Sequence, residues 1–306
     1  MNILVTGGAG FIGSHVVDAY VEAGHEVTVV DNLSTGRKEF VNPRAKFVHM
    51  DIRNRSMHDI FKSQQIDVVN HHAAQMDVRK SVDDPLFDAS VNILGTLNLL
   101  ENCRTYGVRK VVFASTGGAV YGEQEYFPAD EQHPLHPLSP YGISKLAVEK
   151  YLFYYRQVHG LPHVILRYAN VYGPRQNPHG EAGVIAIFAE KMLNKKQPVI
   201  NGDGSQTRDY VFVKDVVCAN LLALDVDKAE VFNIGTGVET TVNELFKSLQ
   251  SLTASGCKEV HAPAKRGEQQ RSVLACRKAS QGLRWQPQVT LRPGLRQTVE
   301  FIKIQR

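Results

Sequence analysis

The sequence predicts an α/β protein in which helices cover both faces of a parallel β-sheet. Its first half alternates short apolar strands with amphipathic helices, a rhythm that favours right-handed crossovers and parallel strand pairing. A glycine-rich turn at residues 7–13 follows the first strand, and Asp31 ends the second. After residue 168 the rhythm loosens into loops rich in Gly, Pro and Asn. We therefore predict a Rossmann-type doubly wound parallel sheet with a smaller α/β C-terminal lobe that binds the substrate.

Hydrophobic periodicity, with Gly and Pro as stop signals, predicts the individual elements. Strands are expected at residues 3–6, 26–30, 46–50, 67–71, 110–114 and 163–168. Helices are expected at residues 11–23, 56–64, 85–106 and 140–158. Two later apolar segments, residues 211–213 and 231–234, are predicted to be strands that return to the first lobe. The predicted division is therefore 1–168 plus 211–235 for the first lobe and 169–210 plus 236–306 for the second.

Composition and charge are those of an ordinary globular protein, with 306 residues, 43% hydrophobic and 22% charged. The formal charge of +4 is distributed in short basic runs, so we expect no nucleic-acid partner. No apolar run approaches the roughly 20 residues of a spanning helix, and residues 1–6 read as a strand rather than a leader peptide. Four widely spaced cysteines without a CxxC pair favour buried thiols in a reducing compartment. These features predict a cytoplasmic protein with no membrane partner.

The glycine-rich turn is expected to bind a dinucleotide. Its glycines permit a tight turn, close approach of the backbone to a pyrophosphate, and close packing of the helix on the strand. The following helix presents unpaired N–H groups to the phosphates. Asp31 stands where an acidic residue binds the ribose hydroxyls, and its charge would repel a 2′-phosphate, so NAD is favoured over NADP. Asp51 and Ile52 could hold the adenine edge; the alternative for Asp51 is a helix cap.

Tyr141 and Lys145 form a second candidate site at the start of an expected helix. Ser139 suits the N-cap and Pro140 the first helical position. Four residues apart, the two side chains project from one helical face. An adjacent ammonium would stabilise the phenolate and lower the pKa of the phenol, so Tyr141 could act as a base. Taken alone, the pair could equally be a core tyrosine beside a surface lysine.

Several segments in order resemble the extended short-chain dehydrogenase/reductase family, and within it the sugar-nucleotide epimerases. The segments are GGAGFIG (7–13), DNLSTG (31–36), HHAAQ (71–75), STGGAVYG (115–122), YGISK (141–145), RYANVYGPRQ (167–176) and GDGSQTRDYVFV (202–213). They span nearly the whole chain. The resemblance implies NAD as cofactor and 4-epimerisation of a UDP-hexose, such as UDP-galactose or UDP-glucose, through a transient 4-keto sugar.

Carried over by position, the resemblance implies a catalytic set of Thr116, Tyr141 and Lys145. Tyr141 would take the sugar O4 proton, Thr116 would hydrogen-bond O4, and Lys145 would hold the cofactor ribose. The implied NAD-binding residues are Gly7, Gly10, Phe11, Ile12, Gly13, Asp31, Asn32, Ser34, Thr35, Gly36, Asp51, Ile52, His72, Ala73, Ala74, Gln75, Asn92, Ser115, Tyr141, Lys145 and Tyr168. The implied substrate-binding residues are Val78, Thr116, Tyr141, Asn170, Val184, Val199, Asn201, Arg208, Lys265, Glu268 and Ser272.

The residues after Thr116 bear on the type of reaction. Related 4,6-dehydratases carry an Asp-Glu pair there and UDP-glucuronate decarboxylases a Glu, which supply further acid/base groups. This chain has Gly117-Gly118-Ala119, with no titratable side chain. The difference favours simple epimerisation over elimination.

The second lobe departs from the family pattern. The family's Arg-x-Gly-Asp appears as residues 265–268, Lys-Arg-Gly-Glu, so either Lys265 or Arg266 could contact the diphosphate. Ser272 occupies a position where some members carry a bulky tyrosine. The smaller serine leaves space near the C2 substituent of the sugar for N-acetylhexosamines. Asn170 could instead be a turn residue, and Arg208 could pair with the neighbouring aspartate.

Beyond the UDP-sugar, the expected partner is a second copy of the chain. The helices at 85–106 and 140–158 resemble the family's dimer surface, which predicts a homodimer; the alternative is that their apolar faces belong to the core. Two histidine pairs, at residues 71–72 and at 133 with 136, have no accompanying carboxylate or cysteine cluster, so no metal is expected. Arg79 could face an acidic sugar or pair with one of the aspartates at 83 and 84. The activities left open are epimerisation of UDP-GlcNAc, UDP-GalNAc or UDP-glucuronate, a net oxidation, and a non-catalytic NAD-binding sensor.

Overall fold

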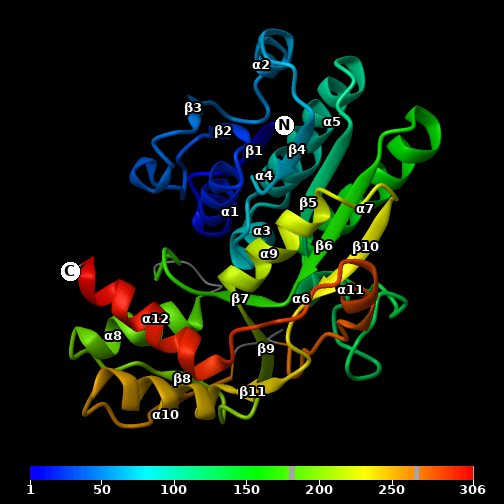
Figure 1. Ribbon diagram of the computed structural model, residues 1–306. Helices are drawn as coiled ribbons and strands as arrows, with labels where there is room; N and C mark the ends of the chain where they lie inside the picture. The colour runs from blue at the N-terminus through cyan, green and yellow to red at the C-terminus, as the bar shows by residue number, and fades with distance from the viewer. Residues whose placement is uncertain (179–182, 265–268, 306) are drawn as a thin grey trace.

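A seven-stranded parallel sheet dominates the computed structural model, which describes residues 1–178, 183–264 and 269–305 (Figure 1). Its strand order is β10-β6-β5-β4-β1-β2-β3, and all neighbouring strands are parallel. The strands are β1 (Asn2–Thr6), β2 (Glu26–Asp31), β3 (Lys46–His49), β4 (Val68–His71), β5 (Lys110–Thr116), β6 (His163–Tyr168) and β10 (Glu230–Ile234). The order reverses at β1, as in a doubly wound sheet, so the predicted fold class is confirmed.

Helices cover both faces of this sheet. One face packs against α1 (Phe11–Glu22), α9 (Val213–Ala223) and α11 (Arg277–Gly282), and the other against α2 (Met57–Ser63), α5 (Gly95–Thr105) and α7 (Pro140–His159). The side chains of each strand alternate between the two cores; in β5, Val112 faces the first and Val111 and Phe113 the second. Because both faces are buried, the strands read as near-continuous apolar runs in the sequence.

The helix expected at residues 85–106 forms in three consecutive pieces. These are α4 (Pro85–Ala89), the π-helical turn η2 (Ser90–Leu94) and α5. Asn92 is buried within the π-helical turn. Gly95 follows it in close contact with the segment after β3, because a Cβ there would lie 2.7 Å from Ile52 Cδ1. This contact packs the residue directly after the π-helical turn against the loop that follows β3.

The smaller lobe has its own sheets and its own core. A three-stranded sheet contains β7 (Asn170–Tyr172), β9 (Thr207–Phe212) and β11 (Glu239–Thr241), and a two-stranded sheet contains β8 (Ile200–Asn201) and β12 (His261–Ala262). The helices α8 (Val184–Leu193), α10 (Val242–Thr253) and α12 (Leu291–Ile304) pack together beside them (Figure 1).

Residues 211–213, expected as a strand that returns to the first lobe, form the end of β9 and the start of α9 and do not join the large sheet. Strand β9 pairs with β7 and β11, and the chain re-enters the larger layer only at Val213, where α9 begins. Val211 packs in the core of the large sheet, whereas Tyr210 and Phe212 pack in the core of the small lobe. Because the side chains of this segment pack in two different cores, its hydrophobic pattern does not indicate which sheet the strand joins.

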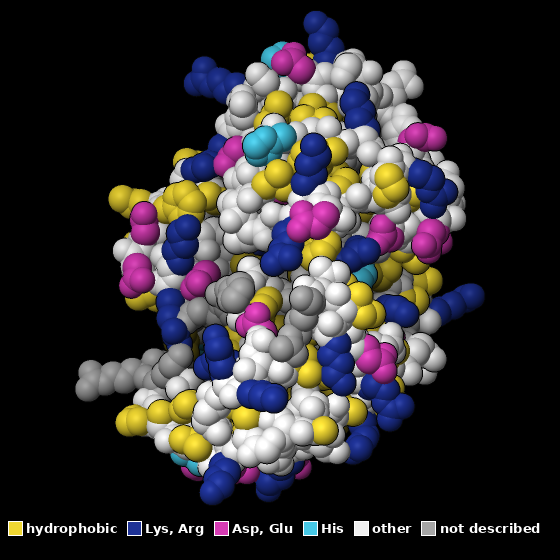
Figure 2. All heavy atoms as spheres, turned by 90° about the vertical axis from the view of Figure 1, so that its left-hand side faces the viewer, with side chains coloured by type: hydrophobic (Ala, Val, Ile, Leu, Met, Phe, Trp, Pro, Cys, Tyr) yellow, Lys and Arg dark blue, Asp and Glu magenta, His cyan; other side chains and the backbone are white. Residues whose placement is uncertain are grey.

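The surface of the protein mixes charges of both signs. On the face shown in Figure 2, basic and acidic side chains are interspersed and do not gather by sign. No helix in the described ranges is long and apolar enough to cross a bilayer.

Candidate active site

The residues expected at the site gather at the carboxyl edge of the large sheet. Strands β1, β2, β4, β5 and β6 end there, at Thr6, Asp31, His71, Thr116 and Tyr168. The loops and helix starts that follow them hold the other residues expected for NAD. In open α/β sheets, ligands bind outside the carboxyl ends of the strands, near the point where the strand order reverses.

The glycine turn after β1 is packed against the loop after β4. Gly7 has φ +71°, and a Cβ there would lie 2.6 Å from the backbone nitrogen of Ala73. At Gly13, a Cβ would lie 2.3 Å from the Gly7 carbonyl oxygen. Gly10 caps α1 without a side-chain hydrogen bond, so the first-turn N–H groups of α1 remain for an anion. The turn therefore fits the pyrophosphate of a dinucleotide.

Asp31 connects this turn to the loop that holds the other residues expected for the ribose. Its Oδ2 accepts a hydrogen bond from the backbone N–H of Ala9 at 3.0 Å, and its Oδ1 accepts one from Leu33 at 2.8 Å. A Cβ on Gly36 would lie 3.0 Å from Oδ1. The buried carboxylate thereby holds residues 32–36, which include Asn32, Ser34 and Thr35, beside α1.

Asp51 is paired within its own loop. It accepts hydrogen bonds from Arg53 Nε at 2.9 Å, Arg53 Nη2 at 2.8 Å and Asn32 Nδ2 at 3.0 Å. The bonds from Arg53 lower the pKa of Asp51 to about 2. The N-cap of α2 is Ser56, so the alternative of a helix cap at Asp51 is wrong. Its contact with adenine, and that of Ile52, remain predictions.

A buried hydrogen-bonded cluster connects the loop after β4 to α7. The side-chain oxygen of Asn92, Oδ1, accepts a hydrogen bond from the Gln75 backbone N–H at 2.8 Å. Asn92 Nδ2 lies 3.0 Å from Asp88 Oδ1 and 3.1 Å from Ser144 Oγ. Gln75 Nε2 also lies 3.1 Å from Asp88 Oδ1. We call these four residues, Gln75, Asp88, Asn92 and Ser144, the α4–α7 cluster.

Both histidines after β4 have structural partners. His71 Nδ1 lies 2.6 Å from Thr6 Oγ1, and its Nε2 lies 2.8 Å from Thr96 Oγ1. The ring of His72 stacks on Tyr168 with centroids 6.3 Å apart. Burial lowers the pKa of His72 to about 3, so the ring is neutral. Within the described ranges, no three His, Cys, Asp or Glu side chains are placed to hold a metal ion.

The expected start of α7 is confirmed. Ser139 Oγ accepts a hydrogen bond from the Gly142 N–H at 3.1 Å, and Pro140 is the first helical residue. Lys145 is buried, and its Nζ donates to the Ala114 carbonyl at 2.9 Å. The same Nζ lies 6.0 Å from the centroid of the Tyr141 ring. The helix therefore brings the phenol and the ammonium together beside the end of β5.

Burial decides the electrostatics of this pair. It raises the pKa of the Tyr141 phenol, and the nearby Asp88 carboxylate raises it further. Burial lowers the pKa of Lys145 to about 8, and Asp88 and Glu149 oppose that change. In the polypeptide alone, the pKa of Tyr141 is therefore raised and not lowered as expected, because desolvation of the phenol dominates.

Thr116 ends β5 and begins a short helix, α6 (Gly117–Val120). Its Oγ1 accepts from the Ala119 N–H at 3.3 Å. A Cβ on Gly117 would lie 2.6 Å from Leu274 Cδ1, whereas one on Gly118 would have only Ser272 Oγ near it, at 4.0 Å. The second lobe therefore contacts the glycines directly after Thr116.

The structure rules out the alternative interpretations of two residues of the small sheet, Asn170 and Arg208. Asn170 pairs with Tyr210 in β7 and is not a turn residue. The Asp209 carboxylate accepts hydrogen bonds from the backbone N–H groups of residues 236, 237 and 274. Arg208 Nη1 donates to the Thr207 carbonyl at 2.7 Å, and Arg208 makes no ion pair with Asp209. The Arg208 guanidinium is therefore not neutralised by its neighbour.

The remaining residues expected for the substrate are distributed around the smaller lobe and its edge. Val78 begins α3 (Val78–Asp83), Val184 begins α8, Val199 precedes β8 and Asn201 ends it. Ser272 is buried, and its carbonyl accepts from the Asp209 N–H at 3.0 Å. Lys265, Arg266 and Glu268 lie outside the described residues, and their contacts remain predictions.

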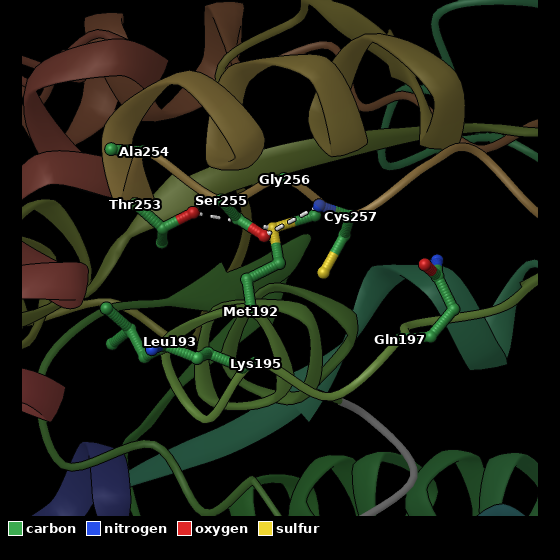
Figure 3. Close-up of a pocket in the computed structure, with 9 residues that line it drawn as sticks. All are labelled: Met192, Leu193, Lys195, Gln197, Thr253, Ala254, Ser255, Gly256 and Cys257. Carbon is green, nitrogen blue, oxygen red and sulfur yellow. Dashed lines mark hydrogen bonds between the residues drawn. The ribbon is translucent and has the colours of Figure 1, made fainter.

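A separate groove in the small lobe contains none of the expected residues (Figure 3). It lies between the ends of α8 and α10 and is lined by Met192, Leu193, Lys195, Gln197, Thr253, Ala254, Ser255, Gly256 and Cys257. At one end of the groove, Ser255 Oγ accepts a hydrogen bond from the Cys257 N–H at 3.1 Å.

Residues 3–235 match the model of the NAD dependent epimerase/dehydratase family. The chain belongs to this family. A putative UDP-glucose 4-epimerase of Methanocaldococcus jannaschii is 50% identical, with 98% of each chain covered.

Solved structures of family members are equally similar. A Thermotoga maritima UDP-glucose 4-epimerase, solved with UDP-glucose, is 51% identical with a TM-score of 0.98, covering 100% of this chain and 99% of that one. A Thermus thermophilus UDP-glucose 4-epimerase, solved with NAD, is 46% identical with a TM-score of 0.95, covering 99% of both chains. The resemblance stated from the sequence is confirmed.

Sequence reasoning within this epimerase/dehydratase family missed Asp88. Its side chain is 1% exposed, although an aspartate three residues after a proline reads as a surface residue. A signal was present, because residues 88, 92, 96 and 103 follow helical spacing and share the face that Leu99 buries.

Proposed function

We propose that the protein catalyses the NAD-dependent 4-epimerisation of a UDP-hexose, interconverting UDP-galactose and UDP-glucose. Relatives named UDP-glucose 4-epimerase or putative UDP-glucose 4-epimerase, at 51% and 50% identity over nearly the full chain, support the predicted activity. The NAD dependent epimerase/dehydratase family and the relative solved with NAD support the cofactor. One structural observation supports it best. Tyr141 and Lys145 lie together beside the end of β5, and the residues that follow this strand, 117–119, have no titratable side chains.

The proposed NAD site extends along the sheet edge from β2 to β6. The N-terminus of α1 would hold the pyrophosphate, and Asp31 would bind the ribose hydroxyls of the adenosine. When bound, NAD supplies the hydride acceptor and, in its oxidised form, a positive charge. That charge would favour the phenolate of Tyr141, which burial alone disfavours.

The chain's own catalytic groups act on the O4 hydroxyl of the sugar. Tyr141 would take the O4 proton as C4 is oxidised, and it would return that proton as C4 is reduced from the opposite face, so that the reaction has no net redox change. Thr116 would donate a hydrogen bond to O4. Lys145 would hold the cofactor ribose and keep a positive charge beside the phenolate.

The second lobe would hold the nucleotide. Arg208, with no ion pair to a described residue, would contact the diphosphate together with Asn170, and Ser272 would line the sugar end. Val184, Val199 and Asn201 would contact the uridine. We propose the division into residues 1–168 plus 211–235 for NAD and 169–210 plus 236–306 for the UDP-sugar.

The activity is tested by incubating the purified protein with UDP-galactose, UDP-GalNAc or UDP-galacturonate and separating the products by chromatography. UDP-galactose should be converted to UDP-glucose without net formation of NADH. Tyr141→Phe should abolish the conversion, whereas Tyr106→Phe, which changes an exposed tyrosine at the C-cap of α5, should not. Conversion of no UDP-sugar by protein with bound NAD, or full activity in Tyr141→Phe, would contradict the proposal.

We also propose that the protein forms a homodimer through the helical segment 85–106, which contains α4, η2 and α5, and through α7. Large apolar side chains are exposed on these helices: Leu86 is 82% exposed, Leu94 60% and Phe153 60%. Light scattering should give twice the chain mass for the wild type and the chain mass for a Leu86→Glu/Leu94→Glu variant. Ile304→Glu, at an equally exposed position on α12, should remain dimeric. A monomeric wild-type protein would refute the homodimer.

A further inference from the structure

Asp88 is a buried carboxylate, and one of its two oxygens accepts no hydrogen bond from the described residues. The side chain is 1% exposed, and its Oδ1 accepts from Gln75 Nε2 at 3.1 Å and Asn92 Nδ2 at 3.0 Å. Its Oδ2 is shielded from solvent and has no hydrogen-bond partner within the described ranges. Burying a carboxylate in this way is costly unless a nearby cation compensates for it.

Lys145 is a buried cation on the helix that packs against α4. Helix α4 packs against α7, and the α4–α7 cluster joins Asp88 to Ser144, the residue before Lys145, through Asn92 Nδ2. The buried Lys145 ammonium donates one hydrogen bond, to the Ala114 carbonyl, and has no salt bridge within 4 Å in the described ranges. Lys145 Nζ also lies 4.7 Å from the centroid of the Phe113 ring, which is uncharged. Two buried opposite charges thus lie on packed helices that Asn92 connects, and neither has an ion pair within the described ranges.

The second carboxylate near Lys145 is already neutralised. Glu149 receives Arg167 Nε at 3.0 Å, Arg167 Nη2 at 2.6 Å and the Ser115 hydroxyl at 2.6 Å. Both side chains of this ion pair are buried, and their opposite charges largely cancel, so Glu149 exerts little net electrostatic effect on Lys145. Asp88 is therefore the carboxylate left to balance Lys145.

The other ionisable groups around α4 do not substitute for this interaction. His71, at the end of β4, and His72, directly after it, interact electrostatically with Lys145 and are neutral, because burial lowers the pKa of both rings. Arg53, from the loop after β3, is bonded to Asp51. On α3, Arg79 and Lys80 are exposed, and Lys80 Nζ lies 4.5 Å from the Phe87 ring on the solvent side. Tyr141 shares the α7 face with Lys145.

We infer that Asp88 is the buried counter-charge of Lys145, a positioning residue that keeps the ammonium protonated and holds the α4–α7 cluster in place. This role deepens the proposed function, because an uncharged Lys145 could not stabilise the phenolate of Tyr141. Asp88 itself touches neither the expected substrate nor the hydroxyl that loses its proton. Its negative charge disfavours the phenolate, so its benefit lies in the charge state of the lysine.

The test is the ionisation of Lys145 in Asp88→Asn, an isosteric change that keeps an acceptor for Gln75 and Asn92. The titration midpoint of Lys145 is read from its side-chain NMR signal with isotopically labelled lysine, and Lys145→Met identifies the signal. We expect the midpoint to fall by roughly one to two pH units. Asp83→Asn, the same chemical change at an exposed residue of α3, should leave the midpoint in place.

Activity provides a second readout. The alkaline limb of the rate–pH profile of Asp88→Asn should move to lower pH by the same amount, whereas a purely structural role would lower the rate without moving the limb. An unmoved Lys145 midpoint would overturn the inference even if epimerisation were confirmed. A moved midpoint in a protein that converts no UDP-sugar would uphold the inference and refute the proposed function. If Asp88→Asn does not fold, the carboxyl carbon of Asp88 in the wild type is measured instead, and a protonated group at neutral pH would overturn the inference.

Discussion

Gly117 packs directly against the side chain of Leu274, a residue of the second lobe. A Cβ on Gly117 would lie 2.6 Å from Leu274 Cδ1 and 2.9 Å from Cδ2. Leu274 is itself buried, and its N–H donates to the Asp209 carboxylate at 3.3 Å. The position directly after Thr116 is therefore kept free of a side chain by packing between the lobes. The acidic residue that related dehydratases carry there would require Leu274 to move.

This contact predicts that the two neighbouring glycines respond differently to alanine. Gly117→Ala should lower the free energy of unfolding by about 1–3 kcal/mol, because the added methyl group overpacks a buried leucine. Gly118→Ala should change it little, since its Cβ would lie 4.0 Å from Ser272 Oγ and meet nothing closer. Urea unfolding of the two variants measures the difference. Equal effects would show that Leu274 moves aside at no cost.

A second prediction concerns the buried ion pair between Arg167 and Glu149, whose side chains are 4% and 5% exposed. Arg167→Met should destabilise the protein by about 3–5 kcal/mol, because it leaves the Glu149 carboxylate buried without its partner. The double variant Arg167→Met/Glu149→Leu should recover most of the loss. Arg109→Met, in an exposed pair with Asp67, should leave the unfolding midpoint unchanged. The pair is unimportant for folding if Arg167→Met behaves like this control.

The buried Lys145 should make stability depend on pH. Its folded pKa of about 8 lies below its ordinary value of 10.5, so the unfolded chain binds more protons between these values and stability rises with pH there. Below pH 8 the buried ammonium is destabilising. Lys145→Met should therefore be more stable than the wild type by about 2 kcal/mol at neutral pH, after allowing for the lost hydrogen bond to Ala114.

This advantage of Lys145→Met should shrink as the pH rises from 8 towards 10.5. Denaturant unfolding of both proteins across that range measures it. Lys80→Met, at an exposed position on α3, should give a difference that does not vary with pH. A constant difference for Lys145→Met as well would mean that the lysine is not desolvated.

Ser272 offers a test of sugar selectivity. It is buried, and its Oγ is the atom nearest to the open position at Gly118. Ser272→Tyr should lower the ratio of UDP-GlcNAc to UDP-glucose activity about tenfold or more, because the ring would fill the space for the C2 substituent. Ser272→Ala should preserve the ratio. The hypothesis fails if a folded Ser272→Tyr protein, judged by thermal unfolding, keeps the wild-type ratio.

Residues close in sequence were the ones whose arrangement could be predicted. The glycine turn, the N-cap at Ser139 and the four-residue spacing of Tyr141 and Lys145 are local features, and a single helix or turn determines their geometry. The direction of the pKa of Tyr141 was predicted incorrectly, because it depends on burial and on Asp88, which belongs to another helix. The pairing of Val211 and Phe212 with β7 in the small sheet was not predicted, because strand pairing is a long-range property.

By itself, the sequence determined the doubly wound sheet, the NAD-type glycine turn and the family, because these depend on periodicity and on contiguous motifs. Only the tertiary structure decided which groups surround the Tyr141–Lys145 pair. Asp88 of α4 is linked to α7 through Asn92, and Glu149 is neutralised by Arg167 of β6. Leu274 packs where a side chain at position 117 would lie. Charge balance and steric exclusion depend on distances between segments far apart along the chain, and these distances exist only once both cores have packed.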